Sequence, residues 1–129
     1  MSELLRILVV DDDRRMAKTL VDIFRVKGYE AEAAHSGSEA LEKVMGGPFG
    51  CAQNGSFDCV LSDIRMPEMD GVELYRAIKA RQPDLPMVLM TAYSTNKLVK
   101  EGLEEGAIAA LTKPLDINAL LAIFSSLHR

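Results

Sequence analysis

The sequence lacks an excess of basic residues. Its 129 residues include 15 Lys and Arg against 19 Asp and Glu, so the formal net charge is −4 and the pI is near 5.2. Domains that bind nucleic acids or acidic membranes usually carry a basic stripe, and none is visible along this chain. We therefore expect no direct nucleic-acid binding by this domain and no membrane association.

Cysteine is scarce, and long apolar runs are absent. Cys51 and Cys59 do not form a CxxC pair, and Cys59 falls in an apolar segment where a thiol behaves as a small apolar side chain. No apolar run approaches the roughly 18 residues that a bilayer span requires, and no signal peptide is recognisable. Together with the low cysteine content, these absences predict a soluble, cytoplasmic domain.

The chain does contain enough apolar residues to build a core. Hydrophobic residues make up 48% of the sequence, which excludes a disordered chain, and a domain of this length buries most of its apolar surface. We expect one domain over residues 1–129, with no output segment after the last helix. The glycine-rich stretch 46–56 exceeds the about 2–6 residues usual for such a connection and predicts an atypical surface loop.

Hydrophobic periodicity alternates between two patterns along the chain. Short apolar or alternating runs predict strands at 7–10, 29–34, 57–62, 87–90 and 109–112. Segments with a 3.6-residue period predict helices at about 14–27, 36–45, 70–81 and 94–104, and another from about 116. Ser36 and Glu39 have the spacing of a capping box. Strict alternation implies a parallel sheet with right-handed crossovers and helices on both faces, which is a doubly wound α/β fold.

Polar residues stand where these strands end. They are Asp11 and Asp12 after the first strand, Asp63 after the third, Thr91 after the fourth and Lys113-Pro114 after the fifth. Ligands of such sheets bind at the carboxyl ends of the strands. If the first and third strands are neighbours, the three aspartates converge, and two carboxylates about 5 Å apart repel by roughly 3 kcal/mol at an effective dielectric of about 20. The cluster therefore needs a cation, and hard oxygen ligands favour Mg²⁺.

This set of groups suits phosphoryl transfer. An ionised Asp63 can attack phosphorus to form an aspartyl phosphate, while Lys113 and the Thr91 hydroxyl bind the phosphoryl oxygens. Any one of these residues alone is more often a turn, cap or surface residue, and Asp13 and Asp70 are interpreted as helix N-caps. The joint arrangement at one sheet edge favours the functional interpretation.

The sequence motifs around these residues resemble those of a known family. The segments that carry the resemblance are Val9-Val10-Asp11-Asp12, Leu61-Ser62-Asp63-Ile64-Arg65-Met66-Pro67 with Asp70-Gly71, Met90-Thr91-Ala92 and Thr112-Lys113-Pro114. They are similar to the receiver domain of two-component response regulators, especially receivers attached to enhancer-binding transcriptional activators. The resemblance covers essentially the whole chain and implies a flavodoxin-like (βα)5 fold with a five-stranded sheet in the order 2-1-3-4-5.

The resemblance also implies roles for individual residues. Asp63 would accept a phosphoryl group from a sensor histidine kinase, and Asp12 and Asp63 would ligate Mg²⁺ directly, with Arg65 contributing its backbone carbonyl and Asp11 acting mainly through water. Thr91 and Lys113 would bind the phosphoryl oxygens, and the Lys113–Pro114 bond would be cis. Phosphorylation would rearrange the face formed by the fourth helix, fifth strand and fifth helix. That face would then bind an output domain or protein, or form a phosphorylation-dependent homodimer.

The chain departs from the family pattern at one position. Where receivers commonly carry a Tyr or Phe switch, three residues before the lysine, this chain has Ala110. Gly102 lies within the predicted fourth helix, where it costs about 1 kcal/mol relative to Ala. We hypothesise that this face responds through a looser shift of that helix, or is specialised for a different partner. Arg65 and Tyr93 flank the expected approach of water, which predicts slow self-hydrolysis of the phosphorylated state.

Other functional classes are weaker. A haloacid-dehalogenase-like phosphatase needs a second Asp two residues after its nucleophile, and Arg65 stands there. A dinucleotide-binding domain needs a glycine-rich first turn, whereas Asp11-Asp12-Asp13 would repel a phosphate. The main alternative is a pseudo-receiver, a protein-interaction module independent of phosphorylation, which Ala110 makes the more serious rival. Neither reading makes the domain an enzyme beyond self-phosphorylation and slow self-dephosphorylation.

Overall fold

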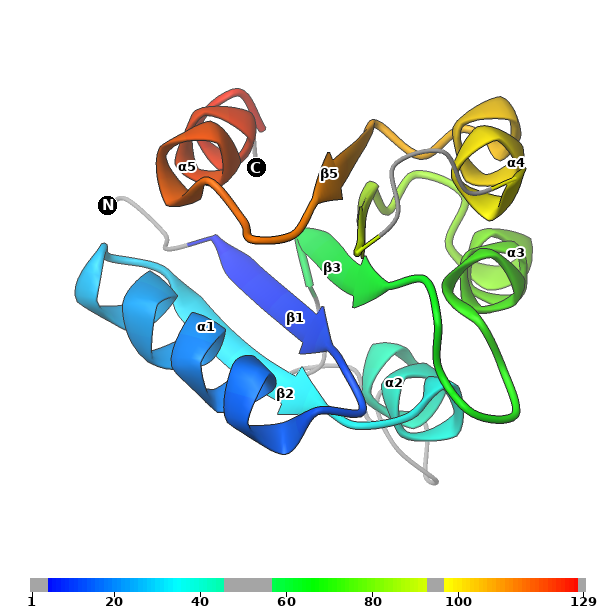
Figure 1. Ribbon diagram of the computed structural model, residues 1–129, viewed down its shortest axis with the longest axis horizontal. Helices are drawn as coiled ribbons and strands as arrows, with labels where there is room; N and C mark the ends of the chain where they lie inside the picture. The colour runs from blue at the N-terminus through cyan, green and yellow to red at the C-terminus, as the bar shows by residue number, and fades with distance from the viewer. Residues whose placement is uncertain (1–4, 46–56, 93–96, 128–129) are drawn as a thin grey trace.

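Strands and helices alternate along the chain in the computed structural model, which describes residues 5–45, 57–92 and 97–127 (Figure 1). The strands are β1 (Arg6–Val10), β2 (Glu30–Ala34), β3 (Cys59–Asp63), β4 (Met87–Thr91) and β5 (Ala109–Thr112). The helices are α1 (Arg14–Val26), α2 (Gly37–Val44), α3 (Gly71–Arg81), α4 (Lys97–Glu105) and α5 (Ile117–Ser125). The predicted loop at 46–56 and the predicted helix start at 94–96 lie outside the described residues.

All strands of the sheet are parallel and follow the order β2-β1-β3-β4-β5. The predicted doubly wound fold and strand order are thereby confirmed. The expected end of the third strand is wrong by one residue, because Asp63 itself pairs with Met90 of β4, and the Ile64 N–H donates to the Met90 carbonyl at 3.0 Å. The acidic residue thus belongs to the strand instead of the loop that follows it.

The sheet separates two apolar layers. Alternate side chains of the central strands enter one cluster with α1 and α5, and the others enter a second cluster with α2, α3 and α4. Figure 1 shows α1 and α5 on one face of the sheet and the other helices on the opposite face. Both β3 and β4 are buried along their whole length, as strands covered on both faces should be.

Aspartates cap three helices, two of them as predicted, and the third, Asp116, at the predicted start of the last helix. Asp13, Asp70 and Asp116 accept backbone N–H bonds at the starts of α1, α3 and α5, and Asp70 forms a full capping box with Glu73. The capping box predicted for α2 is only half formed. Ser36 accepts from the Glu39 N–H, but the Glu39 carboxylate accepts from the N–H of His35 instead of Ser36.

Gly102 has a packing role that the sequence did not indicate. It is buried at the point where α4 crosses the sheet, and a Cβ added there would lie 2.3 Å from Cδ1 of Leu89 and 3.5 Å from Cγ2 of Val72. The absence of a side chain therefore lets the helix backbone approach the sheet closely. Its presence is explained by this close contact.

The charges of α4 oppose its own dipole. Lysines occupy its N-terminal half, no acid lies in its first turn, and no base lies in its last turn, whereas a helix dipole favours the reverse arrangement. Helix α3 supplies the missing cations. Arg76 forms an ion pair with Glu105 at 3.1 Å, and the Lys79 ammonium donates to the Glu105 carbonyl. The C-terminal end of α4 is therefore fastened to α3.

Alanine at position 102 tests the packing role. Alanine raises helix propensity by about 1 kcal/mol, but its methyl group would clash with Leu89, and overpacking costs about 1–3 kcal/mol. We expect Gly102→Ala to lower the free energy of unfolding, measured by urea denaturation, by about 1 kcal/mol. Lys100→Ala, on the exposed side of the same helix, should stay within about 0.5 kcal/mol of the parent. A Gly102→Ala chain more stable than the parent would contradict the packing argument.

Candidate functional site: an acidic cluster at the carboxyl edge of the sheet

Three aspartates meet at the carboxyl edge of the sheet. Asp11 follows β1, is fully buried, and donates its backbone N–H to the Ala34 carbonyl at 3.0 Å. Asp63 ends β3, the strand that pairs with β1. Carboxylate oxygens of Asp11, Asp12 and Asp63 all lie within 4.8 Å of one another. The convergence expected from adjacent first and third strands is therefore present.

Lys113 brings a positive charge into this cluster. It follows β5, and its backbone N–H donates to the Thr91 carbonyl at 2.7 Å. Its Nζ lies 3.3 Å from Oδ2 of Asp11 and 3.3 Å from Oδ2 of Asp63. The Lys113–Pro114 bond is cis, as the resemblance implied. An ammonium between two carboxylates partly offsets their repulsion.

The remaining predicted residues fall at or near the same edge. Thr91 ends β4 with 2% of its surface exposed, and the exposed Arg65 forms a backbone hydrogen bond to the Asp63 carboxylate. Ala110 lies in β5, packed against the apolar cluster that also receives Leu98 of α4. Tyr93 lies outside the described residues.

The site perturbs the ionisation of its own groups. Burial raises the pKa of the Asp63 carboxyl, Lys113 opposes this rise, and the charge of Asp11 adds to it, leaving a pKa above the ordinary value. Burial lowers the pKa of Lys113, but Asp63 and Asp11 raise it more, so its net shift is upward. Lys113 therefore offsets only part of the cost of ionising the buried Asp63 carboxyl.

Comparison with known proteins places these features in a family. The family model for the response regulator receiver domain matches residues 7–125. The chain belongs to the response regulator receiver domain family. It is 44% identical over 114 residues to the transcriptional regulatory protein ZraR of Klebsiella oxytoca, covering 88% of this chain and 24% of ZraR. It is 36% identical over 124 residues to the response regulator MprA of Mycobacterium ulcerans, covering 96% of this chain and 50% of MprA.

Solved receiver structures share the whole fold. A CheY-like receiver from Methanospirillum hungatei superposes with a TM-score of 0.84 at 31% identity, with 96% of this chain and 93% of that one covered. The response regulator TrrA of Thermotoga maritima, solved in complex with Mg²⁺ and BeF, gives 0.80 at 29% identity, with coverage of 95% and 98%. The chain thus matches complete receivers, while it spans about a quarter of the length of ZraR and half that of MprA.

Two residues that the sequence analysis did not single out as functional also contact the acidic site. Ser62 donates its hydroxyl to the main-chain oxygen of Asp63, and Gly71, noted only as part of a turn, packs against that same oxygen. A hydroxyl inside an otherwise apolar strand was the available signal for Ser62. Asp13 is confirmed as a helix cap, although its backbone N–H also donates to Oδ1 of Asp11 at 2.9 Å.

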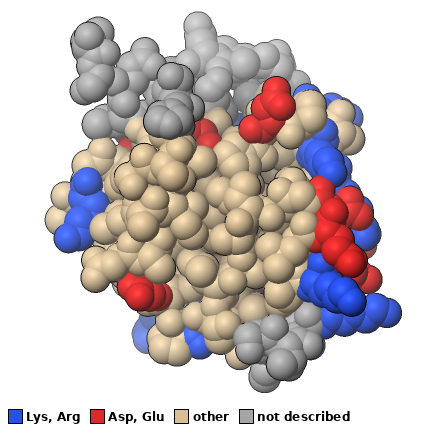
Figure 2. Space-filling model, turned by 90° about the horizontal axis from the view of Figure 1, so that it is seen from above, with Lys and Arg blue, Asp and Glu red and all other residues tan. Residues whose placement is uncertain are grey.

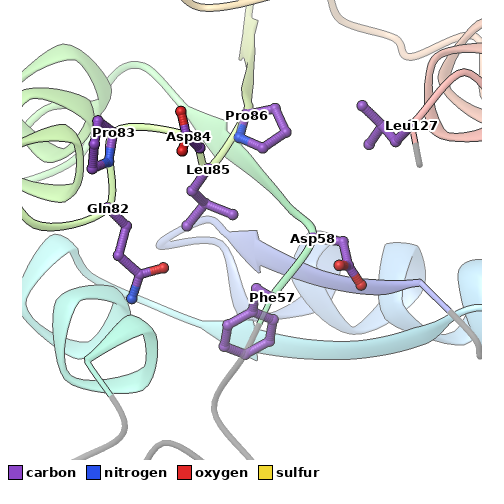
Figure 3. A pocket seen from close by; sticks show the side chains of 8 residues that line it. All are labelled: Phe57, Asp58, Gln82, Pro83, Asp84, Leu85, Pro86 and Leu127. Carbon is purple, nitrogen blue, oxygen red and sulfur yellow. The ribbon is translucent and has the colours of Figure 1, made fainter. Parts of the chain in front are cut away.

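A pocket of about 410 Å³ opens at the other edge of the sheet (Figure 3). It is lined by Phe57 and Asp58 before β3, the 82–86 connection before β4, and Leu127 after α5. None of the predicted site residues lines this pocket, and the acidic cluster lies at the opposite edge of the sheet. Among the described helices, none combines the length and apolar character that a membrane crossing needs.

Replacing Asp63 tests the electrostatics of the cluster without any metal. The folded state binds the Asp63 proton more tightly than the unfolded chain does, because the folded pKa is raised. Ionised Asp63 thus subtracts stability above the ordinary carboxyl pKa, and this penalty disappears as pH falls below about 4. We expect Asp63→Asn to melt at a higher temperature than the parent at pH 7 in EDTA, with the difference closing at low pH.

The matched control is Asp84→Asn, which changes an exposed carboxylate far from the cluster. It should leave the melting temperature near that of the parent at every pH. If Asp63→Asn melted below the parent at pH 7, the carboxylate would be a net stabiliser and the electrostatic account of the site would be wrong.

Proposed function

We propose that this receiver domain, taken as residues 1–129, accepts a phosphoryl group onto Asp63 from a phosphohistidine of a sensor histidine kinase. The observation that carries the proposal is the contact of Asp63 with Lys113 at 3.3 Å inside a cluster of three convergent carboxylates. The domain acts in the cytoplasm as a phosphoacceptor and signalling switch. Its only chemical turnover is self-phosphorylation from small donors and slow self-dephosphorylation.

The donor set fits Mg²⁺. Carboxylate oxygens are hard ligands, and an octahedral Mg²⁺ uses one or two of them and keeps several waters. Asp12 and Asp63 would hold the ion through their carboxylates and Arg65 through its backbone carbonyl, with Asp11 acting mainly through water. When bound, the ion neutralises charge that develops on the transferred group.

The transfer needs one nucleophile and a set of positive groups. An oxygen of Asp63 forms the new bond to phosphorus as the bond from phosphorus to the histidine nitrogen breaks, and the imidazole leaves with that electron pair. Lys113 holds one phosphoryl oxygen through its ammonium, and the Thr91 hydroxyl donates to another. Lys113 already contacts the acceptor carboxylate, so it needs little reorganisation.

The output follows from the charge added at this edge. A phosphoryl group on Asp63 brings negative charge and acceptor oxygens, and Thr91 moves toward it. Because β4 pairs with β5, this shift reaches the face made by α4, β5 and α5. Figure 2 shows that the surface over β5 and α5 carries few charged side chains, while charges gather on the side of α3 and α4. Helix α5 itself has no charged residue.

That face is the surface we assign to the output domain or target, or to a phosphorylation-dependent homodimer. Ala110 on β5 leaves no aromatic side chain to swing inward, so the response is a shift of α4 instead. Because Arg76 and Lys79 of α3 hold the C-terminal end of α4, the N-terminal end of α4 is the part that shifts. The same alanine is the reason for a second candidate function, a pseudo-receiver that binds partners whether or not it is phosphorylated, which ranks below the first because the predicted acceptor-site residues are present.

Direct phosphorylation separates these two functions. Incubation with Mg²⁺ and acetyl phosphate should add one phosphoryl group, measured by intact mass, and the addition should be absent in Asp63→Asn and in EDTA. Asp12→Asn should lose the reaction because a metal ligand is gone. Asp13→Asn is the matched control, since it retains the helix cap and should react as the parent does. An unmodified parent chain would favour the pseudo-receiver.

The lifetime of the phosphorylated state depends on Arg65. Its exposed side chain stands two residues after Asp63, where it shields the phosphoryl group from water. We expect the parent to retain the phosphoryl group for minutes or more and Arg65→Asn to release phosphate faster, measured as phosphate release after donor removal. Arg81→Asn, an exposed arginine at the end of α3, serves as the control. Equal release rates for Arg65→Asn and the parent would reject the shielding role.

A further inference from the structure

The hydroxyl of Ser62 lies in an unusual place. Every residue of β3 is buried, and Ser62 has no exposed surface. A hydroxyl moved into an apolar layer costs about 1–3 kcal/mol unless it forms a hydrogen bond. The bond it forms is to the main-chain oxygen of the next residue, Asp63, at 2.9 Å. The buried hydroxyl is therefore directed at the backbone of the acceptor residue.

Gly71 approaches the same oxygen from the first turn of α3. A Cβ at this position would lie 2.6 Å from the Asp63 oxygen and 3.0 Å from Cα of Ile64, both of them backbone atoms that cannot move aside cheaply. The Gly71 N–H also donates to the Ile64 carbonyl at 2.8 Å. The glycine is required here for close approach, so that the start of α3 rests on the end of β3.

These contacts hold one peptide unit at both of its ends. The carbonyl of the Asp63–Ile64 peptide accepts from Ser62 and packs against Gly71, while the N–H of that peptide donates to Met90 of β4 at 3.0 Å. The orientation of this peptide determines where the Asp63 side chain leaves the strand. Oδ2 of that side chain lies 3.3 Å from the Nζ of Lys113.

We propose that Ser62 and Gly71 are positioning residues for the acceptor aspartate. By holding the Asp63–Ile64 peptide, they keep the Asp63 carboxylate within reach of Lys113 and of the other two acids. This inference rests on the proposed function of Asp63 and adds two residues that touch neither phosphoryl group nor metal. Reactive groups must be placed closely for transfer, and a misplacement of about 1 Å can cost up to about 100-fold in rate.

The test compares Ser62→Ala with Cys59→Ala. Both remove one buried heavy atom from β3, but Cys59 faces the opposite apolar cluster and lies away from Asp63. We expect Ser62→Ala to slow phosphorylation by acetyl phosphate about 10- to 100-fold, to weaken Mg²⁺ binding in calorimetry, and to speed hydrogen exchange of the Ile64 amide. Cys59→Ala should change none of the three. Ser62→Thr, which keeps the hydroxyl, should recover most of the rate.

The outcomes separate this inference from the proposed function. If the parent is phosphorylated and Ser62→Ala reacts and binds Mg²⁺ as the parent does, the positioning role is wrong. Equal losses in Ser62→Ala and Cys59→Ala would also overturn it, because the effect would then be general to the strand. If the parent is not phosphorylated at all, the proposed function fails, and the exchange rate of the Ile64 amide decides the inference by itself. Gly71→Ala should show a larger loss than Ser62→Ala when it folds.

Discussion

The structure depends on how three carboxylates are held together at one edge of a buried sheet. Asp11 is fully buried and Asp63 nearly so, and such groups repel each other in a medium of low dielectric. Lys113, which lies 102 residues from Asp11 along the chain, pairs with both. The ammonium offsets part of this repulsion, while burial and the charge of Asp11 still leave the pKa of the Asp63 carboxyl above its ordinary value. Uncompensated negative charge of this kind favours a cation at this edge of the sheet.

The fold supplies the precision that this charge arrangement needs. Parallel pairing sets β1, β3, β4 and β5 in register, so that Asp63 lies opposite Met90 and Thr91 lies opposite Thr112. The last peptide of β3 is then held by a hydroxyl, a glycine and a ladder hydrogen bond. Rigid elements place reactive groups more accurately than loops do. Asp63 therefore belongs to the strand, while the lysine and the other acids reach it from strand ends.

The opposite behaviour appears in α4. Its charges run against its dipole, its centre is a glycine, and its last carbonyl group and carboxylate depend on Arg76 and Lys79 of α3. Helix α4 is thus stabilised more by contacts with neighbouring elements than by the helix propensity and charges of its own residues. Elements of low intrinsic stability are the ones that move most readily in switching proteins. The carboxyl edge of the sheet is thus held firmly, while the neighbouring helix α4 depends on contacts with α3. This combination is compatible with a signalling domain of the receiver family.

Much of the fold and of the candidate site could be predicted from local sequence patterns. Strand and helix order, the caps at Asp13 and Asp70, and the gathering of acids at one edge followed from periodicity and from which residues end each strand, since these depend on near neighbours in the chain. The half-formed cap at Ser36, where the Glu39 carboxylate turned to His35, shows the limit: two acceptable donors lay one residue apart.

The sequence by itself determined the order of the elements and the acidic character of one sheet edge, because periodicity and strand ends are local properties. Only the tertiary structure decided that Lys113 bridges Asp11 and Asp63, that Gly102 and Gly71 lie where a side chain has little space, and that the Ser62 hydroxyl donates to the main-chain oxygen of Asp63. Those features are distances of a few ångströms between atoms whose residues, in most cases, are far apart in the chain. They exist only once the sheet has brought its strands into register.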